Sequence, residues 1–214
     1  MKTYKFGKLV VERYRGGPIE VNNYIVYEEG APEVIIIDPG FESDEVVKRV
    51  ESLKPSKITI YLTHGHGDHI GGIEFLRSHF TDAKVAISVG DAEMITNPEE
   101  NLSIFIDKEI TLKPAEILLK EGDTIKTGSH IGVITLLPGH TRGGSALIFD
   151  EVIFSGDSLF YESIGRTDFP GGDGRALIHG LKDKILTLSD RPVFPGHGNE
   201  TSVEHEKRNN MYLF

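Results

Sequence analysis

The chain has 214 residues, of which 38% are hydrophobic and 26% are charged, a composition typical of a soluble globular protein with a sizeable core. Acidic residues outnumber Lys and Arg by 33 to 23, and the formal net charge is −10. This excess argues against a nucleic-acid groove, which needs clustered cations to meet phosphates. There is no cysteine, which excludes disulfides, thiolate metal ligands and a cysteine nucleophile.

The beginning of the chain, residues 1–7, lacks the apolar core of a signal peptide. No apolar run approaches the ~18 residues that a membrane span needs. We therefore expect a cytoplasmic protein with no membrane or nucleic-acid partner. Because no repeat, low-complexity tract or linker interrupts the sequence, we expect residues 1–214 to form a single domain.

Short apolar runs between turn signals predict alternating strands and helices along the chain. The β-branched run 34–37 is typical of a strand buried on both faces. The other predicted strands are 5–12, 24–28, 58–62, 84–88, 131–137, 145–149, 152–154 and 192–195. One predicted helix begins after Ser43, and two others cover about 70–80 and 174–188. A final predicted helix has a capping box at Thr201 and Glu204. This mixture indicates layered α/β packing, and residues 89–115 fit either a flap or a connecting segment.

One loop concentrates the chemistry of the chain. Between a predicted strand and a predicted helix, it places His64, His66, Asp68 and His69 within six consecutive positions, with glycines among them. Histidine is the commonest metal ligand near neutral pH, and glycine lets the backbone turn sharply enough for neighbouring side chains to converge. Clustered histidines and carboxylates are typical of metal or catalytic sites. The sequence predicts a metal site at this loop.

Three later residues share another pattern: His140, Asp157 and His197 each follow a predicted strand and lie beside glycine. Strand ends hold side chains rigidly, and adjacent glycines allow close approach. A single histidine at a strand end is more often structural than a ligand. Taken together with the loop, however, these residues supply enough donors for two cations.

The ordered set of seven donors resembles that of the metallo-β-lactamase superfamily, and the resemblance covers essentially the whole chain. It implies an α/β fold, a four-layer αβ/βα sandwich with the site along one edge of its two sheets. It also implies two metal sites, with His64, His66 and His140 at one, Asp68, His69 and His197 at the other, and Asp157 bridging both.

The chemistry of these donors agrees with the resemblance. A carboxylate such as Asp157 can span two cations about 3.5–4 Å apart, and such a pair lowers the pKa of a bound water from about 15.7 towards ~7. The resemblance therefore implies a dinuclear hydrolase that uses a metal-bound hydroxide, with Asp68 as the partner for its proton. Zinc suits these donors best, and iron and manganese accept the same ligands. Asp38 fits either an acid that steadies the ligand loop or a simple turn residue.

A further run of residues, 165–173, begins eight residues after Asp157. Together with residues 195–201 and 206–210, it is similar to the short, single-domain glyoxalase II-like hydrolases, the hydroxyacylglutathione hydrolase-like group. This resemblance implies hydrolysis of a small-molecule thioester such as S-lactoylglutathione.

Arg166 lies where that group places a basic residue near the substrate carboxylate. An alternative is that Arg166 braces its own loop by pairing with Asp168 or Asp173. Two alternative activities also stay open. A mononuclear-iron persulfide dioxygenase shares residues 165–169 and the histidines, and a lactonase shares the metal ligands.

Overall fold

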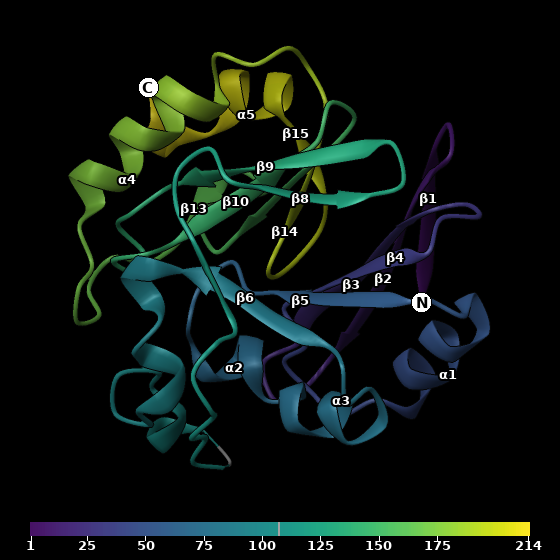
Figure 1. Ribbon diagram of the computed structural model, residues 1–214. Helices are drawn as coiled ribbons and strands as arrows, with labels where there is room; N and C mark the ends of the chain where they lie inside the picture. Colours follow the sequence, from purple (N-terminus) through teal and green to yellow (C-terminus); the bar gives the residue numbers. More distant parts are fainter. Residues whose placement is uncertain (107) are drawn as a thin grey trace.

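The computed structural model describes residues 1–106 and 108–214 and contains two β-sheets that face each other, with helices on their outer sides (Figure 1). In spatial order, the first sheet consists of β1 (Lys2–Phe6), β2 (Leu9–Gly16), β3 (Val21–Glu28), β4 (Glu33–Ile37), β5 (Lys57–Tyr61), β6 (Lys84–Ser88) and β7 (Ile117–Leu119). The second consists of β15 (Thr201–Ser202), β14 (Pro192–Pro195), β11 (Ile153–Gly156), β10 (Ser145–Ile148), β9 (His130–Leu136) and β8 (Thr124–Thr127). A small hairpin pairs β12 (Leu159–Phe160) with β13 (Ser163–Ile164).

The helices divide between the two sheets. The first sheet carries α1 (Asp44–Leu53), α2 (Gly67–Ile70) and α3 (Ile73–His79), and the second carries α4 (Gly174–Gly180), a π-helical turn (Leu181–Ile185) and α5 (Val203–Asn209). Shorter 3-10 turns are Val89–Asp91, Met94–Thr96, Ser103–Phe105 and Met211–Leu213. None of these described helices combines the length and apolar character that a membrane span requires.

The alternation of side chains along β4 explains the layers. Val34 and Ile36 pack into a cluster with the helices of the first sheet, whereas Ile35 and Ile37 pack into the core between the sheets. A strand buried on both faces must be apolar at every position, as the sequence indicated. A third cluster, which includes Ile153 of β11 and Leu177 of α4, lies between the second sheet and its helices. These three clusters separate four layers, so the predicted αβ/βα sandwich is confirmed.

Aromatic rings join the two sheets. Tyr24 of the first sheet lies edge-on to Phe154 of the second, with ring centroids 5.2 Å apart. Phe154 also stacks on Phe194, with centroids 5.6 Å apart. Fully buried aromatic side chains contribute a large part of core stability, so these contacts fix how the sheets face each other. Because the two sheets are held in this orientation, the ends of strands from both sheets lie at the same edge of the sandwich.

Three local predictions were wrong in detail. The predicted strand 5–12 is two antiparallel strands, because Gly7 adopts a positive φ of 61° and turns the chain. The predicted helix 70–80 is split into α2 and α3 at Gly71 and Gly72. The final helix is capped one residue later than predicted: the Ser202 hydroxyl accepts from His205 N, and Thr201 belongs to β15.

The stretch 89–115, apart from residue 107, which lies outside the described residues, packs against the ligand loop. Gly67 N donates to Asn101 O at 2.7 Å, and a Cβ on Gly67 would lie 2.8 Å from that of Ser103. The stretch thus covers the base of the loop that carries the predicted ligands.

Candidate metal centre

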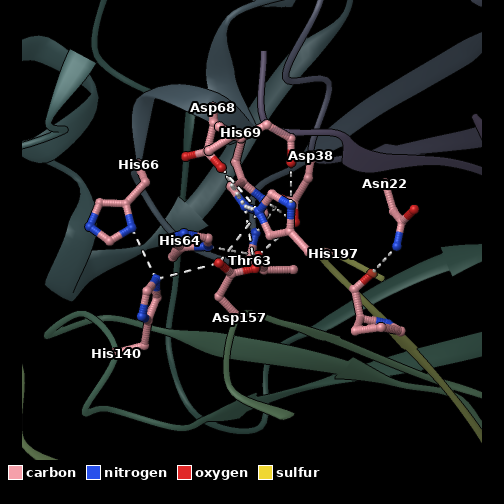
Figure 2. Close-up of polar contacts among 12 residues, drawn as sticks. Asn22, Asp38, Thr63, His64, His66, Asp68, His69, His140, Asp157 and His197 are labelled. Carbon is pink, nitrogen blue, oxygen red and sulfur yellow. Dashed lines mark hydrogen bonds and ion pairs between the residues drawn. The ribbon is translucent and has the colours of Figure 1, made fainter. Parts of the chain in front are cut away.

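Side chains from four loops converge at one edge of the sandwich (Figure 2). The loop after β5 supplies four of the predicted donors, and the other three follow β9, β11 and β14. Strands β11 and β14 are parallel neighbours, so their carboxyl ends meet at the same edge. The structure therefore brings together all seven donors: His64, His66, Asp68, His69, His140, Asp157 and His197.

One glycine shows how closely these loops approach. A Cβ on Gly196, just before His197, would lie 2.6 Å from His69 Cε1 and would also strike the Asp157 carboxylate. No larger residue fits at this position without moving a donor. The glycine beside His197 is thus required by the close approach of two donors from different loops.

The first group of donors contains three imidazoles: His64, His66 and His140. Their nearest nitrogens, His66 Nδ1 and His140 Nε2, are 3.0 Å apart. His140 Nδ1 donates to Arg166 O at 2.8 Å, which leaves the lone pair of its Nε2 facing the centre. His64 Nε2 is buried and has no hydrogen-bond partner among residues 1–106 and 108–214.

The second group contains Asp68, His69 and His197. Asp68 Oδ2 lies 3.0 Å from His197 Nε2 and 3.4 Å from His69 Nε2. The two imidazole nitrogens are 3.2 Å apart. His197 Nδ1 lies 3.2 Å from Ile19 O, to which it can donate, so its Nε2 lone pair also faces the centre.

Asp157 lies between the two groups. One of its oxygens, Oδ2, is 3.6 Å from His140 Nε2 of the first group and 3.6 Å from His197 Nε2 of the second. Its other oxygen, Oδ1, is 3.3 Å from His69 Nε2 and makes no hydrogen bond within the part of the chain that the structure describes. This is the position required of a carboxylate that bridges two cations.

These residues fit a pair of divalent cations. Imidazole and carboxylate donors converge with their lone pairs inwards, and two of the buried polar atoms, His64 Nε2 and Asp157 Oδ1, lack a hydrogen-bond partner. Buried polar atoms are otherwise almost always satisfied, so such a pair of atoms needs an explanation. Coordination by a metal supplies one.

Asp38 holds the ligand loop from behind. Its buried carboxylate accepts from Thr63 N at 2.8 Å, from the Thr63 hydroxyl at 2.7 Å and from His69 Nδ1 at 3.0 Å. The same hydroxyl lies 3.1 Å from His64 Nδ1 and can accept its proton, which turns His64 Nε2 towards the centre. The geometry is that of an acid that steadies the loop rather than of a simple turn residue.

The charges of the centre are strongly perturbed. Burial and neighbouring imidazoles lower the pKa of His64, and they lower that of His66 to about 3, so both rings are neutral donors. Burial opposes ionisation of Asp157, but His69, His197 and His140 together outweigh burial, and the pKa of Asp157 falls below its usual range. Burial likewise lowers the pKa of His69, yet Asp68 and Asp157 raise it well above the ordinary value. A proton on His69 therefore competes with a cation for this position.

One side of the centre is more open than the other. The side chains of His64, His66, His69 and His140 are at most 6% exposed, whereas Asp68 is 13% and His197 is 24% exposed. The solvent reaches the centre from the side of the second group. This is the side on which a water molecule or a substrate carbonyl can approach.

Arg166 lies apart from the seven donors. Its guanidinium donates to both oxygens of Asp168, at 2.8 and 2.7 Å, and stacks over the Phe169 ring at 3.9 Å. This is the loop-bracing arrangement, and the ion pair is with Asp168 rather than with Asp173. The substrate-binding role of Arg166 stays a prediction.

Sequence reasoning missed an acid that ties two ligand loops together. The buried carboxylate of Asp91 accepts from Gly65 N at 3.2 Å, from the Thr141 hydroxyl at 2.6 Å and from Gly143 N at 2.6 Å. It thereby joins the loop of His64 and His66 to the loop of His140. Asp91 follows β6 and sits beside a glycine, the same pattern that identified the later donors, so this signal could have found it.

Asn22 of β3 braces the remaining loop. Its amide donates to Pro195 O at 2.9 Å and to Gly198 O at 3.0 Å, on either side of His197. The Tyr24 hydroxyl donates to the same Pro195 carbonyl at 2.6 Å. Residues of the first sheet therefore position His197, a predicted metal ligand that follows a strand of the second sheet. Nothing local in the sequence signals this long-range contact.

A four-layer sandwich with a cluster of histidines and aspartates at one sheet edge defines a class of metal-binding proteins. Residues 16–197 match the family model described as the metallo-beta-lactamase superfamily, and the chain belongs to this superfamily. Members of the superfamily bind divalent metals, and the histidine and aspartate cluster is present here.

Individual relatives are similar along most of the chain. The hydroxyacylglutathione hydrolase GloC of Haemophilus influenzae is 36% identical over 182 residues, 83% of this chain and 86% of the relative. The crystal structure of the BLEG-1 B3 metallo-beta-lactamase is 33% identical, covers 95% of this chain and 99% of its own, and has a TM-score of 0.87. The structure of TTHA1623 in a di-iron-bound form is 32% identical, covers 94% and 100%, and has a TM-score of 0.78.

Proposed function

We propose that this protein is a dinuclear metal-dependent hydrolase that cleaves a thioester such as S-lactoylglutathione. The observation that carries the proposal is the convergence of seven imidazole and carboxylate donors around a bridging Asp157. Two divalent cations bound there would lower the pKa of a water molecule and polarise a substrate carbonyl. We propose zinc as the metal, because it suits these donors.

Six of the seven residues would form two separate metal sites. His64, His66 and His140 would hold one cation, and Asp68, His69 and His197 the other. Asp68 is the one terminal carboxylate among these six and lies on the open side of the centre. Its oxygens can therefore accept a proton from a water molecule that attacks the thioester carbonyl.

Two observations support a thioester as the substrate. The chain is similar to a relative named as a hydroxyacylglutathione hydrolase, and the aligned region covers most of both chains. The run 165–173 has the pattern of the glyoxalase II-like group. A cysteine or serine nucleophile is not required, because the proposed chemistry uses water.

The test is hydrolysis of S-lactoylglutathione by purified protein whose bound metals have been counted by mass spectrometry. We expect turnover with two metals per chain and loss of turnover after chelation. Turnover of a lactone or a β-lactam but of no thioester would overturn the proposed substrate class. The β-lactam is included because the chain is similar to a B3 metallo-beta-lactamase. One iron per chain, with oxygen uptake on a persulfide, would overturn the hydrolase itself.

A further inference from the structure

The short hairpin of β12 and β13 connects two parts of the metal centre. It begins two residues after Asp157, and it leads into Arg166, whose carbonyl oxygen accepts from His140 Nδ1 at 2.8 Å. A Cβ on Gly165, at the end of the hairpin, would overlap the Asp157 carbonyl oxygen and would lie 3.2 Å from His140 Cγ. Asp157 and His140 are neighbours at the centre (Figure 2). The position of the hairpin therefore helps to determine where both ligands lie.

The base of the hairpin is anchored beside the centre. The Ser155 hydroxyl, on the strand that leads to Asp157, donates to Leu159 O at 2.8 Å. The Leu159 side chain is fully buried in the third apolar cluster. The next ring along the hairpin, that of Phe160, lies 6.3 Å from the His197 ring. The hairpin thus contacts a third ligand loop as well.

A buried carboxylate of α5 holds the tip of the hairpin. Glu162 N, at the tip, donates to both oxygens of Glu206, each at 3.1 Å. Glu206 Oε1 also accepts from the Thr201 hydroxyl at 2.6 Å, and its Oε2 accepts from Asn210 Nδ2 at 2.7 Å. Asn210 Nδ2 donates in addition to Ser163 O at 3.1 Å. The side chains of Glu206 and Asn210 are fully buried, so α5 fixes the tip with two residues that are four positions apart on one helix face.

The backbone at the tip needs such support. Glu162 has a positive φ of 54°, in the left-handed region that costs a residue other than glycine free energy. Its N–H group is the one that both Glu206 oxygens accept from. Every hydrogen-bond partner of Glu206 is a donor, which suits a carboxylate because its two oxygens only accept. An amide at this position would turn a donor towards one of these donors.

We propose that Glu206 is a positioning residue of the metal centre, a role that rests on the dinuclear hydrolase proposed above. By fixing the tip of the hairpin, Glu206 holds the end of the hairpin against Asp157 and His140. Asp157 is the carboxylate that would bridge the two cations, and His140 is a donor to one of them. Release of the tip therefore weakens both metal sites. Glu206 acts through the backbone of the hairpin and takes no part in the reaction itself.

The experiment measures metal binding as well as turnover. Competition with a chromogenic chelator gives the zinc affinity, and the visible absorption spectrum of the protein loaded with cobalt(II) reports the geometry of coordination. Glu206→Gln keeps the shape of the side chain but replaces an acceptor by a donor. Thr201→Val removes a hydroxyl that donates to Glu206, and Thr201→Ser keeps it.

Glu12→Gln is the matched control. Glu12 is also a buried carboxylate that accepts from side chains, here Arg49 and Tyr27, but it lies on β2 and joins that strand to α1. The control therefore removes a comparable set of hydrogen bonds without changing the support of the hairpin.

We expect Glu206→Gln to weaken zinc binding about 10–100-fold, the effect usual for residues that orient metal ligands from behind. The cobalt spectrum should change, and kcat should fall more than KM rises, because the substitution acts on the ligands rather than on the substrate. Thr201→Val should have a smaller effect in the same direction, and Thr201→Ser should restore zinc affinity. Glu12→Gln should lower the midpoint of thermal unfolding but leave zinc affinity and the cobalt spectrum unchanged.

A zinc affinity and a cobalt spectrum like those of the wild type in Glu206→Gln would overturn the positioning role. An equal loss of zinc affinity in Glu12→Gln would also overturn it, because the loss would then follow from lower stability alone. If Glu206→Gln does not fold, the comparison of Thr201→Val with Thr201→Ser decides, since both keep the carboxylate. Equal zinc affinity in these two variants would contradict the proposal.

The wild type separates this proposal from the proposed function. If it binds two metals but cleaves no thioester, the proposed substrate class fails and the positioning role of Glu206 stands on the metal measurements. If it binds fewer than two metals, the dinuclear centre fails, and with it the positioning of its ligands.

Discussion

Asp68 is the residue on which the proposed chemistry depends most directly. Its carboxylate lies on the open side of the centre, 3.0 Å from His197 Nε2. We expect Asp68→Ala to lower kcat for S-lactoylglutathione about 10²–10⁴-fold, the usual contribution of a positioned proton acceptor. The variant should stay folded, because Asp68 belongs to none of the three apolar clusters.

The measurement combines steady-state kinetics with metal counting and circular dichroism. Asp68→Asn is the matched change, because it keeps the shape of the side chain but cannot accept a proton at neutral pH. A rate like that of the wild type in either folded variant would rule out Asp68 as the proton acceptor.

Asp91 is predicted to act on the donors from a distance. Among the described residues it makes no hydrogen bond to a ligand side chain, yet its hydrogen bonds hold Gly65 in one ligand loop and both Thr141 and Gly143 in another. We expect Asp91→Ala to lower metal affinity about 10–100-fold, the effect usual for residues that orient ligands. A competition titration with a chromogenic chelator measures this directly.

Asp91→Asn provides the graded comparison, since an amide oxygen can still accept some of these bonds but an amide nitrogen cannot. Metal affinity should therefore fall less in Asp91→Asn than in Asp91→Ala. Asp123→Ala is the control, because Asp123 lies in an exposed turn and its carboxylate accepts from Lys120 N of that same turn. Equal metal affinity in Asp91→Ala and the wild type would contradict the prediction.

At the residue scale, the sequence predicts the metal ligands but not the residues that orient them. The donors are recognisable because His64, His66, Asp68 and His69 crowd into one loop. The ligands are oriented by hydrogen bonds between residues far apart in sequence, such as that between Asp91 and Thr141. Only the fold brings such residues together. Arg166 shows the converse: its identity suits a substrate carboxylate, whereas its geometry is settled by its neighbour Asp168.

At the scale of elements, helix α1 is joined to the first sheet by an ion pair between a half-buried arginine and a buried carboxylate. Arg49 of α1 donates to both oxygens of Glu12 on β2, at 2.6–2.9 Å, and the Tyr27 hydroxyl donates to the same carboxylate at 2.9 Å. Burial raises the pKa of Glu12, but the bonds from Arg49 and Tyr27 outweigh burial and lower it below the ordinary value. The ionised form of Glu12 is therefore favoured by folding.

This shift predicts how stability depends on pH. A carboxylate whose pKa is lowered by folding stabilises the protein above its unfolded pKa of about 4.5, and the stabilisation is lost as the pH falls through the folded pKa. We expect Glu12→Gln to lower the free energy of unfolding by about 1–3 kcal/mol at pH 7, because it leaves buried donors poorly satisfied. The difference between variant and wild type should shrink below pH 4.5.

Urea titrations at a series of pH values measure this effect. Glu29→Gln is the control: Glu29 pairs with Lys5 at an exposed position, where an ion pair contributes at most about 1 kcal/mol. A Glu12→Gln deficit that is constant from pH 7 to pH 3 would show that the charge of Glu12 is not what fastens the helix.

The boundaries of elements were less predictable than their existence. The apolar spacing from Ile70 to Phe80 fits one continuous helix, yet the chain breaks at Gly72, where a Cβ would lie 2.8 Å from the Pro39 carbonyl oxygen. The break results from the approach of a distant turn. The local periodicity of apolar residues carries no information about such an approach. The apolar runs that form β4 and β5, in contrast, reflect burial of these strands, and their bounds were predicted to within one residue.

At the scale of the whole molecule, the metal centre lies where the two sheets meet, so it could either hold them together or be held by them. The core between the sheets argues for the second. It contains Tyr24, Phe154 and Phe194 and is buried independently of the donors. Burial of an apolar side chain of this size stabilises the folded protein by about 1.5–3 kcal/mol. This contribution does not depend on a bound cation.

We therefore expect chelation to abolish turnover while leaving a folded protein with a lower midpoint of thermal unfolding. Removing the cations leaves Asp68 and Asp157 crowded at the centre, with only imidazoles to offset their charge. At a metal concentration about 1,000 times Kd, binding contributes about 4 kcal/mol, which corresponds to roughly 10 °C in a protein of this size. Calorimetry with and without the chelator measures the shift, and near-ultraviolet circular dichroism reports whether the packing of the aromatic core survives. Loss of that signal on chelation, or a broad uncooperative transition, would show that the cations hold the sheets together and that the centre has a structural role.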